Sequence, residues 1–161
     1  MKKLFIPIFC IIILLCSCEK IPSVTAVTKG IKFNALLDYE GAKNNYSVLI
    51  KNNGKMIVTS IDNGITYTYM GGIMEVGLKG ISKEYEISSL NENTITDFFY
   101  AIFSESEKLS QDIRKKDGRL CIQGKTDKYL FALYLSGNGL PLEIEEKNFN
   151  ITATLSKMTV I

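Results

Sequence analysis

Residues 31–39 read IKFNALLDY, a stretch in which apolar side chains occupy every second position and only Leu36 breaks the alternation. A strand points successive side chains to opposite faces of a sheet, so a period of two predicts a strand with one buried face. The same alternation returns over residues 46–50 and again over residues 56–60. These three stretches predict the start of an antiparallel sheet.

Turn-forming pairs separate the alternating stretches. Asn53-Gly54 and Asn63-Gly64 are strong signals for a short hairpin, and Gly71-Gly72 is a third turn of this kind. Further strands are expected at 65–69, 74–78, 85–87, 120–123, 129–135, 140–145 and 149–155, with turns at Asp117-Gly118 and 136–139. This regular spacing predicts a curled antiparallel sheet or half-open barrel of about eight to nine strands.

One helix is expected between the two groups of strands. The apolar residues that follow the spacing of a single helix face are Ile95, Phe98, Phe99, Ile102 and Phe103. Asn93 or Thr94 is suited to cap this helix, and Asp97 is placed for a capping box at its positive end. We therefore expect a mainly β (α+β) fold, with one long amphipathic helix packed on the concave face of the sheet.

The N-terminus carries the pattern of a lipoprotein signal. The basic pair Lys2-Lys3 precedes an apolar run over residues 4–15, which is shorter than the ~20 residues that a membrane-spanning helix needs. The run ends in Leu15-Cys16-Ser17-Cys18, which resembles the bacterial lipobox. We expect cleavage between Ser17 and Cys18 and a diacylglyceryl thioether on the Cys18 thiol. An ordinary secretory signal with incidental cysteines is the alternative.

The expected organisation has three parts: a lipoprotein signal peptide at 1–17 that is removed, a lipidated cysteine and polar tether at 18–29, and a single β-rich domain at 30–161. Removal of residues 1–17 would leave 144 residues. The expected location is the extracytoplasmic face of a cell membrane, held by lipid. Without Lys2 and Lys3 the chain has 17 basic and 17 acidic residues, so nothing in its charge favours nucleic acid as a partner.

The amino-acid composition excludes several kinds of catalytic and metal site. The chain has no histidine, which excludes triads with an imidazole base and histidine-ligated zinc. After cleavage and lipidation only Cys121 remains, so we expect a small buried hydrophobe and no disulfide. Glu143, Glu145 and Glu146 form the densest carboxylate cluster, and we expect them to face water rather than to hold calcium. We expect no metal, no cofactor and no catalytic residue.

Several stretches follow an order found in a known family. They are IKFNA at 31–35, YSV at 46–48, MIV at 56–58, the helix at 95–103, GLPLEI at 139–144 and FNIT at 149–152. In this order the chain resembles the LolA/LolB-like lipoprotein-localisation fold and, within it, the small GerS-like lipoproteins of spore-forming Gram-positive bacteria. The resemblance implies a half-open barrel whose concave face receives an acyl chain or docks a protein. Two features distinguish the chain from the diffusible carriers of this fold. It is expected to keep its own lipid anchor, and it lacks the helix that usually precedes the first strand.

Two functions are compatible with these expectations. The first is a non-enzymatic binding module that engages an envelope or sporulation protein through sheet edges and aromatic residues such as Tyr67 and Tyr69, which are otherwise ordinary cross-strand pairs. The alternative is binding of a lipid, acyl chain or other apolar ligand in a groove between sheet and helix. The residues that would line this groove are Phe98, Phe99, Phe103, Met56, Met70 and Met74. The same residues would also suit a filled core.

Overall fold

The computed structural model describes residues 30–89, 97–109 and 112–161. Within these residues the chain forms 11 strands, an α-helix and a short 3-10 helix. The elements are β1 (Ile31–Tyr39), β2 (Ala42–Ile50), β3 (Met56–Ser60), β4 (Thr66–Met70), β5 (Ile73–Leu78), β6 (Ile81–Glu86), η2 (Ile87–Ser89), α2 (Phe98–Lys108), β7 (Arg114–Lys116), β8 (Arg119–Lys125), β9 (Leu130–Leu135), β10 (Pro141–Glu146) and β11 (Ile151–Val160).

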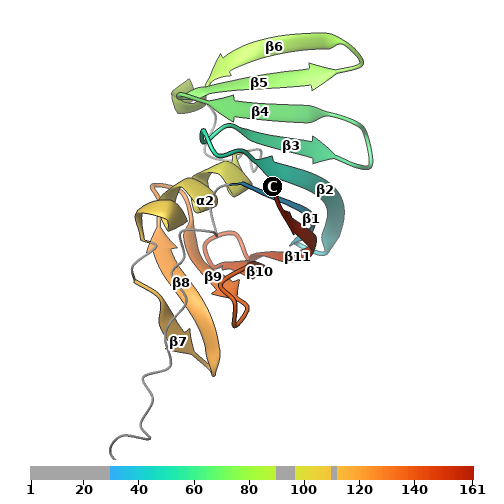
Figure 1. Cartoon of the computed structure of the whole chain (residues 1–161). Coiled ribbons are helices and arrows are strands. Elements are labelled where there is room, and N and C mark those ends of the chain that lie inside the picture. The colour runs from blue at the N-terminus through green and yellow to red at the C-terminus, as the bar shows by residue number, and fades with distance from the viewer. Residues whose placement is uncertain (1–29, 90–96, 110–111) are drawn as a thin grey trace, which may run out of the picture.

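All the described strands belong to one antiparallel sheet, in the order β6-β5-β4-β3-β2-β1-β11-β10-β9-β8-β7. Two meanders, β1 to β6 and β7 to β11, meet where the first strand pairs with the last, with Ala35 opposite Leu155 and Tyr39 opposite Ile151. The sheet curls without closing, because β6 and β7 lie at its two ends (Figure 1).

The expected fold class, a mainly β curled sheet with one helix, is confirmed, but the expected eight to nine strands are too few. β7 consists of three charged residues that pair with β8 across a turn at Asp117 and Gly118, whose φ angles are 52° and 78°. Two positive φ values in succession are the geometry of a type I′ hairpin. β6 is exposed along its whole length. Neither strand has the alternating burial by which a period of two is recognised.

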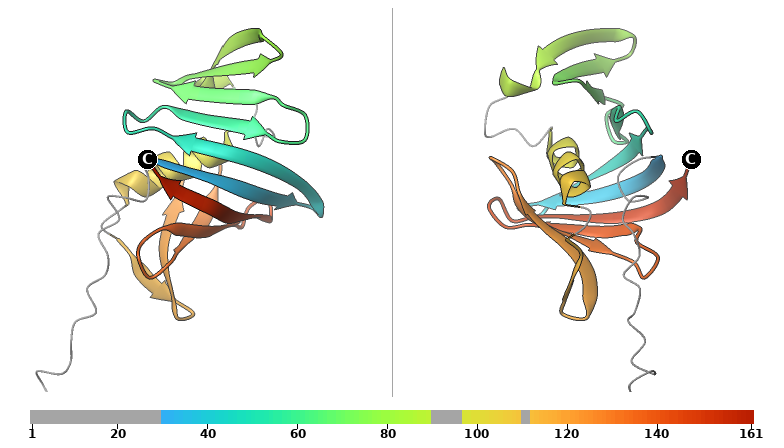
Figure 2. Two further views of the ribbon diagram at one scale, coloured as in Figure 1. Left: turned by 45° about the vertical axis from the view of Figure 1, so that its right-hand side comes forward. Right: turned by 60° about the vertical axis from the view of Figure 1, so that its left-hand side comes forward.

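The core lies between the concave face of the sheet and α2 (Figure 2). The alternation predicted for β1 is confirmed, since Ile31, Phe33, Ala35 and Leu37 are buried. The ring of Phe33 has its centroid 5.4 Å from that of Phe103 in α2. Burying one such side chain contributes roughly 1.5–3 kcal/mol, so the helix is held by its aromatic face.

Asp97 ties the N-terminal end of α2 to the start of β9. It occupies the N-cap position, yet its side chain makes no cap hydrogen bond within the described residues. Instead, Oδ1 accepts hydrogen bonds from Nζ of Lys128 at 3.1 Å and from the hydroxyl of Tyr129 at 2.9 Å. The position expected for Asp97, inside the first turn as part of a capping box, is therefore wrong, because the helix begins directly after it at Phe98. Asn93 and Thr94, which were expected to cap the helix, lie outside the described residues.

Candidate binding surface

The space expected to form a groove under the helix is filled at five of its six predicted positions. The buried side chains are those of Phe98, Phe99, Phe103, Met56 and Met74, each at most 3% exposed. Aromatic rings pack against one another there: the centroid of Phe99 lies 5.7 Å from that of Tyr46 and 5.3 Å from that of Phe98. Met70 is 53% exposed. It follows the buried Tyr69 along β4, so it faces the opposite side of the sheet and does not join the other five.

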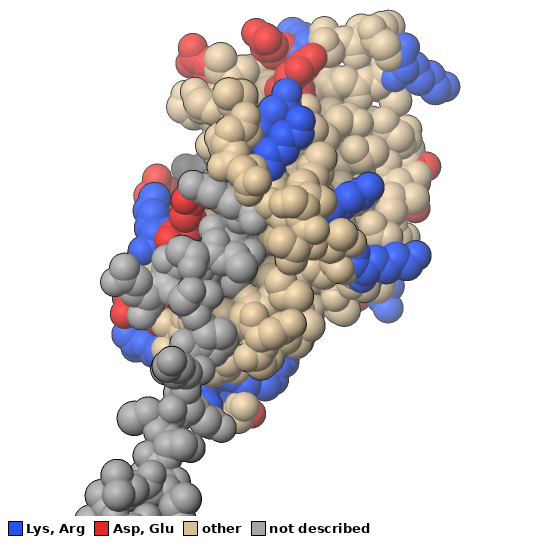
Figure 3. Space-filling view, in the orientation of Figure 1, with Lys and Arg blue, Asp and Glu red and all other residues tan. Residues whose placement is uncertain are grey.

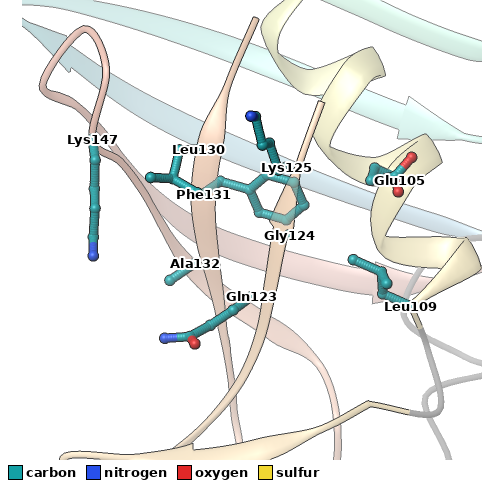
Figure 4. A pocket seen from close by; sticks show the side chains of 9 residues that line it. All are labelled: Glu105, Leu109, Gln123, Gly124, Lys125, Leu130, Phe131, Ala132 and Lys147. Carbon is teal, nitrogen blue, oxygen red and sulfur yellow. The ribbon is translucent and has the colours of Figure 1, made fainter. Parts of the chain in front are cut away.

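A cavity of about 460 Å³ lies around the β8–β9 hairpin, beside the C-terminal end of α2. Its lining residues are Glu105, Leu109, Gln123, Gly124, Lys125, Leu130, Phe131, Ala132 and Lys147. Phe131 points toward the helix side, where Glu105 and Leu109 lie, whereas Leu130, Ala132 and Lys147 lie on the other side of the hairpin (Figure 4). None of the six residues predicted to line a groove contributes to this cavity.

The opposite half of the sheet extends past the helix. We call its last three strands, β4, β5 and β6, the wing. Figures 1 and 2 show the wing reaching beyond the region that α2 covers. The wing is built from two tight hairpins, and the second turns at Lys79 and Gly80, whose φ angles are 49° and 84°. The sequence pattern predicted β4 and β5 but only a short stretch around Tyr85 for β6.

On the concave face, the side chains of each cross-strand row become more exposed to solvent toward the outer edge of the wing. In one row Met56, Tyr69 and Met74 are at most 3% exposed, but the outermost member, Tyr85, is 38% exposed. Leu78 and Ile81, which are opposite each other at the end of the β5–β6 hairpin, are 41% and 79% exposed. The apolar face that forms the core thus continues into solvent.

The outer face of the wing carries acidic side chains. Glu75 in β5 lies directly opposite Glu84 in β6, and Glu86 shares their face because residues two apart on a strand do so. Like charges in directly opposed positions destabilise a sheet. In the space-filling view, acidic and basic side chains gather over the end of the molecule where the wing lies, beside a broad uncharged surface (Figure 3). The concave face of the wing is thus mainly apolar, whereas its outer face carries these carboxylates beside the exposed side chains of Met70 and Ile73.

The two tyrosines predicted as exposed contacts lie on β4, away from the sheet edge. Tyr67 is half-buried and pairs across to Val76. Tyr69 is fully buried, and its ring stacks on that of Tyr100 in α2 with 5.0 Å between centroids. The prediction that Tyr69 is an exposed contact is wrong, because α2 covers this part of the concave face. The exposed aromatic residue of the wing is Tyr85.

Three buried titratable groups, Tyr69, Tyr129 and Cys121, are held in their neutral forms. Burial, followed by the charge of Asp97, raises the pKa of Tyr69 and of Tyr129 far above the ordinary tyrosine value. Burial also raises the pKa of the Cys121 thiol, which is fully buried as predicted. A thiol with a raised pKa is a poor nucleophile, since the thiolate is the reactive form. Within the described ranges, no three His, Cys, Asp or Glu side chains are grouped to hold a metal.

Glu146 is a structural residue that the sequence pattern missed. It is 3% exposed, and its carboxylate accepts three backbone N–H groups: those of Leu130 and Asn148 at Oε1, at 2.9 and 2.8 Å, and that of Phe149 at Oε2, at 2.8 Å. The expectation that this carboxylate faces water is wrong. A signal was present, because Ile144 and Glu146 share a face of β10 and Ile144 is a core residue.

The other two carboxylates of that cluster belong to an ion-pair ladder on the outer face. Glu143 pairs with Arg119, whose guanidinium lies 4.0 Å from the ring centroid of Tyr134. Glu145 accepts a hydrogen bond from the Tyr134 hydroxyl at 2.7 Å and lies 3.7 Å from Nζ of Lys116. These contacts join β7, β8, β9 and β10, so the ladder stabilises the sheet.

No helix in the described part of the chain is long and apolar enough to cross a membrane. No protein-family model and no curated protein matches the sequence.

Solved structures give low-scoring likenesses. The chain is similar to NE2245, a LolA superfamily protein from Nitrosomonas europaea, at 12% identity and a TM-score of 0.44, covering 86% of this chain and 90% of that one. It is also similar to the MucA/MucB complex of Pseudomonas aeruginosa, at 12% identity and a TM-score of 0.42, covering 80% of this chain and 50% of that one. The chain thus spans half the length of the latter.

Proposed function

We propose that this chain is a non-enzymatic binding module, held by lipid on Cys18 at the extracytoplasmic face of a cell membrane, that engages a protein of the cell envelope through the wing. One observation carries the proposal: the concave apolar face continues beyond α2 and leaves Leu78, Ile81 and Tyr85 exposed. Exposed apolar surface that is continuous with a core is typical of a protein-interaction site. Aromatic side chains such as that of Tyr85 are enriched where such sites contribute most of the binding energy.

The packing under the helix supports a protein partner over an acyl chain at that position. A chain entering between sheet and helix would have to displace Phe99 or Phe103, both at most 2% exposed. Removing such an aromatic side chain from a core costs about 3–5 kcal/mol. A partner that covers the wing displaces only water from side chains that are already exposed.

A cross-linking experiment in cells tests the site. A photoreactive amino acid replaces Ile81 on the wing, and in a matched control it replaces Leu142, which is 43% exposed on β10. We expect a protein adduct from position 81 and none from position 142. Equal labelling at both positions, or adducts with lipid alone, would contradict the proposal.

The anchor is tested separately from the site. The proposed attachment follows from the Leu15–Cys18 pattern, in which Cys18 supplies the thiol. Two or more acyl chains hold a protein stably on a bilayer, whereas one chain holds it marginally. The Cys18→Ser variant should therefore leave the membrane fraction, and Cys16→Ser should remain in it. Retention of the Cys18→Ser variant by membranes would overturn the anchor.

A second candidate function is binding of a lipid or other apolar ligand. The observation that favours it is the cavity of about 460 Å³ beside the end of α2, which falls within the range of about 300–1,000 Å³ usual for ligand sites. Native mass spectrometry of the protein purified from its own envelope would detect a retained acyl ligand. Loss of that ligand in a Leu109→Gln variant would place it in this cavity, and protein without any lipid would remove this candidate.

A further inference from the structure

β6 forms one edge of the sheet in the part of the chain that the structure describes. Within the described residues it pairs with β5 alone, in an unbroken register from Glu86 opposite Ile73 to Ile81 opposite Leu78. It has six residues and no proline. Proteins usually protect such an edge with a very short strand, a bulge, proline, charged side chains or a covering element, and of these devices β6 carries the charges, on Lys83, Glu84 and Glu86. A regular edge of this length can accept the main chain of another strand.

The concave side of this edge is apolar. Ile81 and Tyr85 are 79% and 38% exposed there, and Lys83 lies between them with Nζ 5.2 Å from the centroid of the Tyr85 ring. The charge of Lys83 is thus held against an aromatic face, and its aliphatic stem adds to the apolar surface. A strand added to β6 would place every second side chain against Ile81 and Tyr85. These positions suit apolar residues.

The outer side of the same edge is acidic. Glu84 and Glu86 alternate with the concave-facing residues along β6, and Glu75 lies directly behind Glu84 on β5. The intervening side chains of an added strand would lie beside these carboxylates. Lysine or arginine at those positions would add attractive cross-strand pairs to Glu84 and Glu86 and offset the repulsion between Glu84 and Glu75.

A second copy of the chain is a poor occupant of this edge. Two copies of β6 related by a twofold axis must pair antiparallel with their concave faces on the same side. In the two registers with the greatest overlap, either Lys83 lies opposite its own copy or Glu84 lies opposite its own copy. Both registers bring like charges together at the centre of the pairing, which is a known way to prevent edge-to-edge association.

We propose that β6 binds an extended segment of a partner protein in which apolar residues alternate with lysine or arginine, and that this segment adds to the sheet as a further strand. The proposal rests on the proposed function and names the kind of partner for the wing. Main-chain hydrogen bonds supply affinity, and the apolar and acidic faces of β6 select the sequence.

Peptide binding to the full lipidated chain in detergent tests this inference. The probe is a short peptide alternating valine with lysine, and the comparison peptide alternates valine with glutamate. We expect the lysine peptide to bind and to slow amide exchange along β6, and the glutamate peptide not to bind. Glu84→Lys should weaken binding of the lysine peptide by about tenfold. Asp112→Lys, an exposed position just before β7 at the far edge, should change it by less than about twofold.

Each contrary result has a definite meaning. No binding of the lysine peptide, equal binding of both peptides, or equal effects of Glu84→Lys and Asp112→Lys would overturn the inference. So would a concentration-dependent dimer of the chain that protects β6. Cross-linking of a protein at position 81 together with failure of the peptide test would leave the proposed function standing and remove only strand addition. Failure of both experiments would remove both proposals.

Discussion

The phenyl ring of Phe131 in β9 lies over Gly124, its cross-strand partner in β8. A Cβ at position 124 would lie 2.5 Å from Cζ of Phe131 and 2.7 Å from Cδ1 of Leu109. Both distances are far below van der Waals contact, so a side chain fits there only if the Phe131 ring and the Leu109 side chain shift. A ring that covers a glycine in the neighbouring strand compensates for the packing that glycine lacks.

Gly124→Ala should lower the free energy of unfolding by about 1–3 kcal/mol, because the added methyl group overpacks the site between sheet and helix. The measurement is urea unfolding of the variant and the wild type. In a Phe131→Leu background the penalty of Gly124→Ala should shrink by at least about 0.5 kcal/mol, since the two residues touch. Strictly additive effects would contradict this account of the contact.

Ser106→Ala should raise the free energy of unfolding by about 1 kcal/mol. The Ser106 hydroxyl is fully buried in α2 and has no hydrogen-bond partner among the described residues, so its removal relieves a desolvation cost. Ser104→Ala, at a half-buried position of the same helix, gains only helix propensity, about 0.5 kcal/mol. Equal gains in the two variants would mean that the Ser106 hydroxyl costs nothing.

Glu146→Ala should lower the free energy of unfolding by about 3 kcal/mol or more, because three backbone N–H groups lose their acceptor. Glu146→Gln should cost less, since its amide oxygen still accepts from Leu130 and Asn148. Glu143→Ala is the control, as it removes a partly exposed ion pair worth at most about 1 kcal/mol. Equal losses in Glu146→Ala and Glu143→Ala, measured by urea unfolding, would contradict the role of Glu146.

Stability should fall as the pH rises above about 10, the ordinary tyrosine pKa. Burial and then the charge of Asp97 raise the folded-state pKa of Tyr69 and of Tyr129. The unfolded chain therefore releases protons above this pH that the folded chain keeps. Above about pH 10 the free energy of unfolding then falls by up to about 1.4 kcal/mol per pH unit for each tyrosine. Below that pH the stabilisation from each tyrosine is fully present.

Urea midpoints measured between about pH 8 and about pH 11 would test this dependence. Tyr129→Phe should reduce the alkaline slope by up to about 1.4 kcal/mol per pH unit, at a cost of about 1.5–3 kcal/mol at neutral pH for the lost hydrogen bond to Asp97. An unchanged slope in this variant would show that Tyr129 does not contribute to the alkaline loss.

The local sequence pattern was sufficient to predict a strand or helix wherever one face of the element is buried and the other is exposed to solvent. The alternation around Phe33 predicted β1, and the spacing of Phe98, Phe99 and Phe103 predicted the face by which α2 packs. Glycine pairs predicted the hairpin turns, because positive φ is available to few other residues. The presence of a curled, mainly β sheet with a helix on its concave face could therefore be read from the chain in advance.

The binding surface depended on contacts between residues distant in sequence. Tyr69 and Tyr85 belong to the same cross-strand row, but only the position of α2 buries the first and leaves the second exposed. The burial of Glu146 depends on the N–H group of Leu130 in a different strand. Periodicity states which side chains share a face, whereas the packing of the helix and the register of the strands determine which part of that face is left to bind a partner.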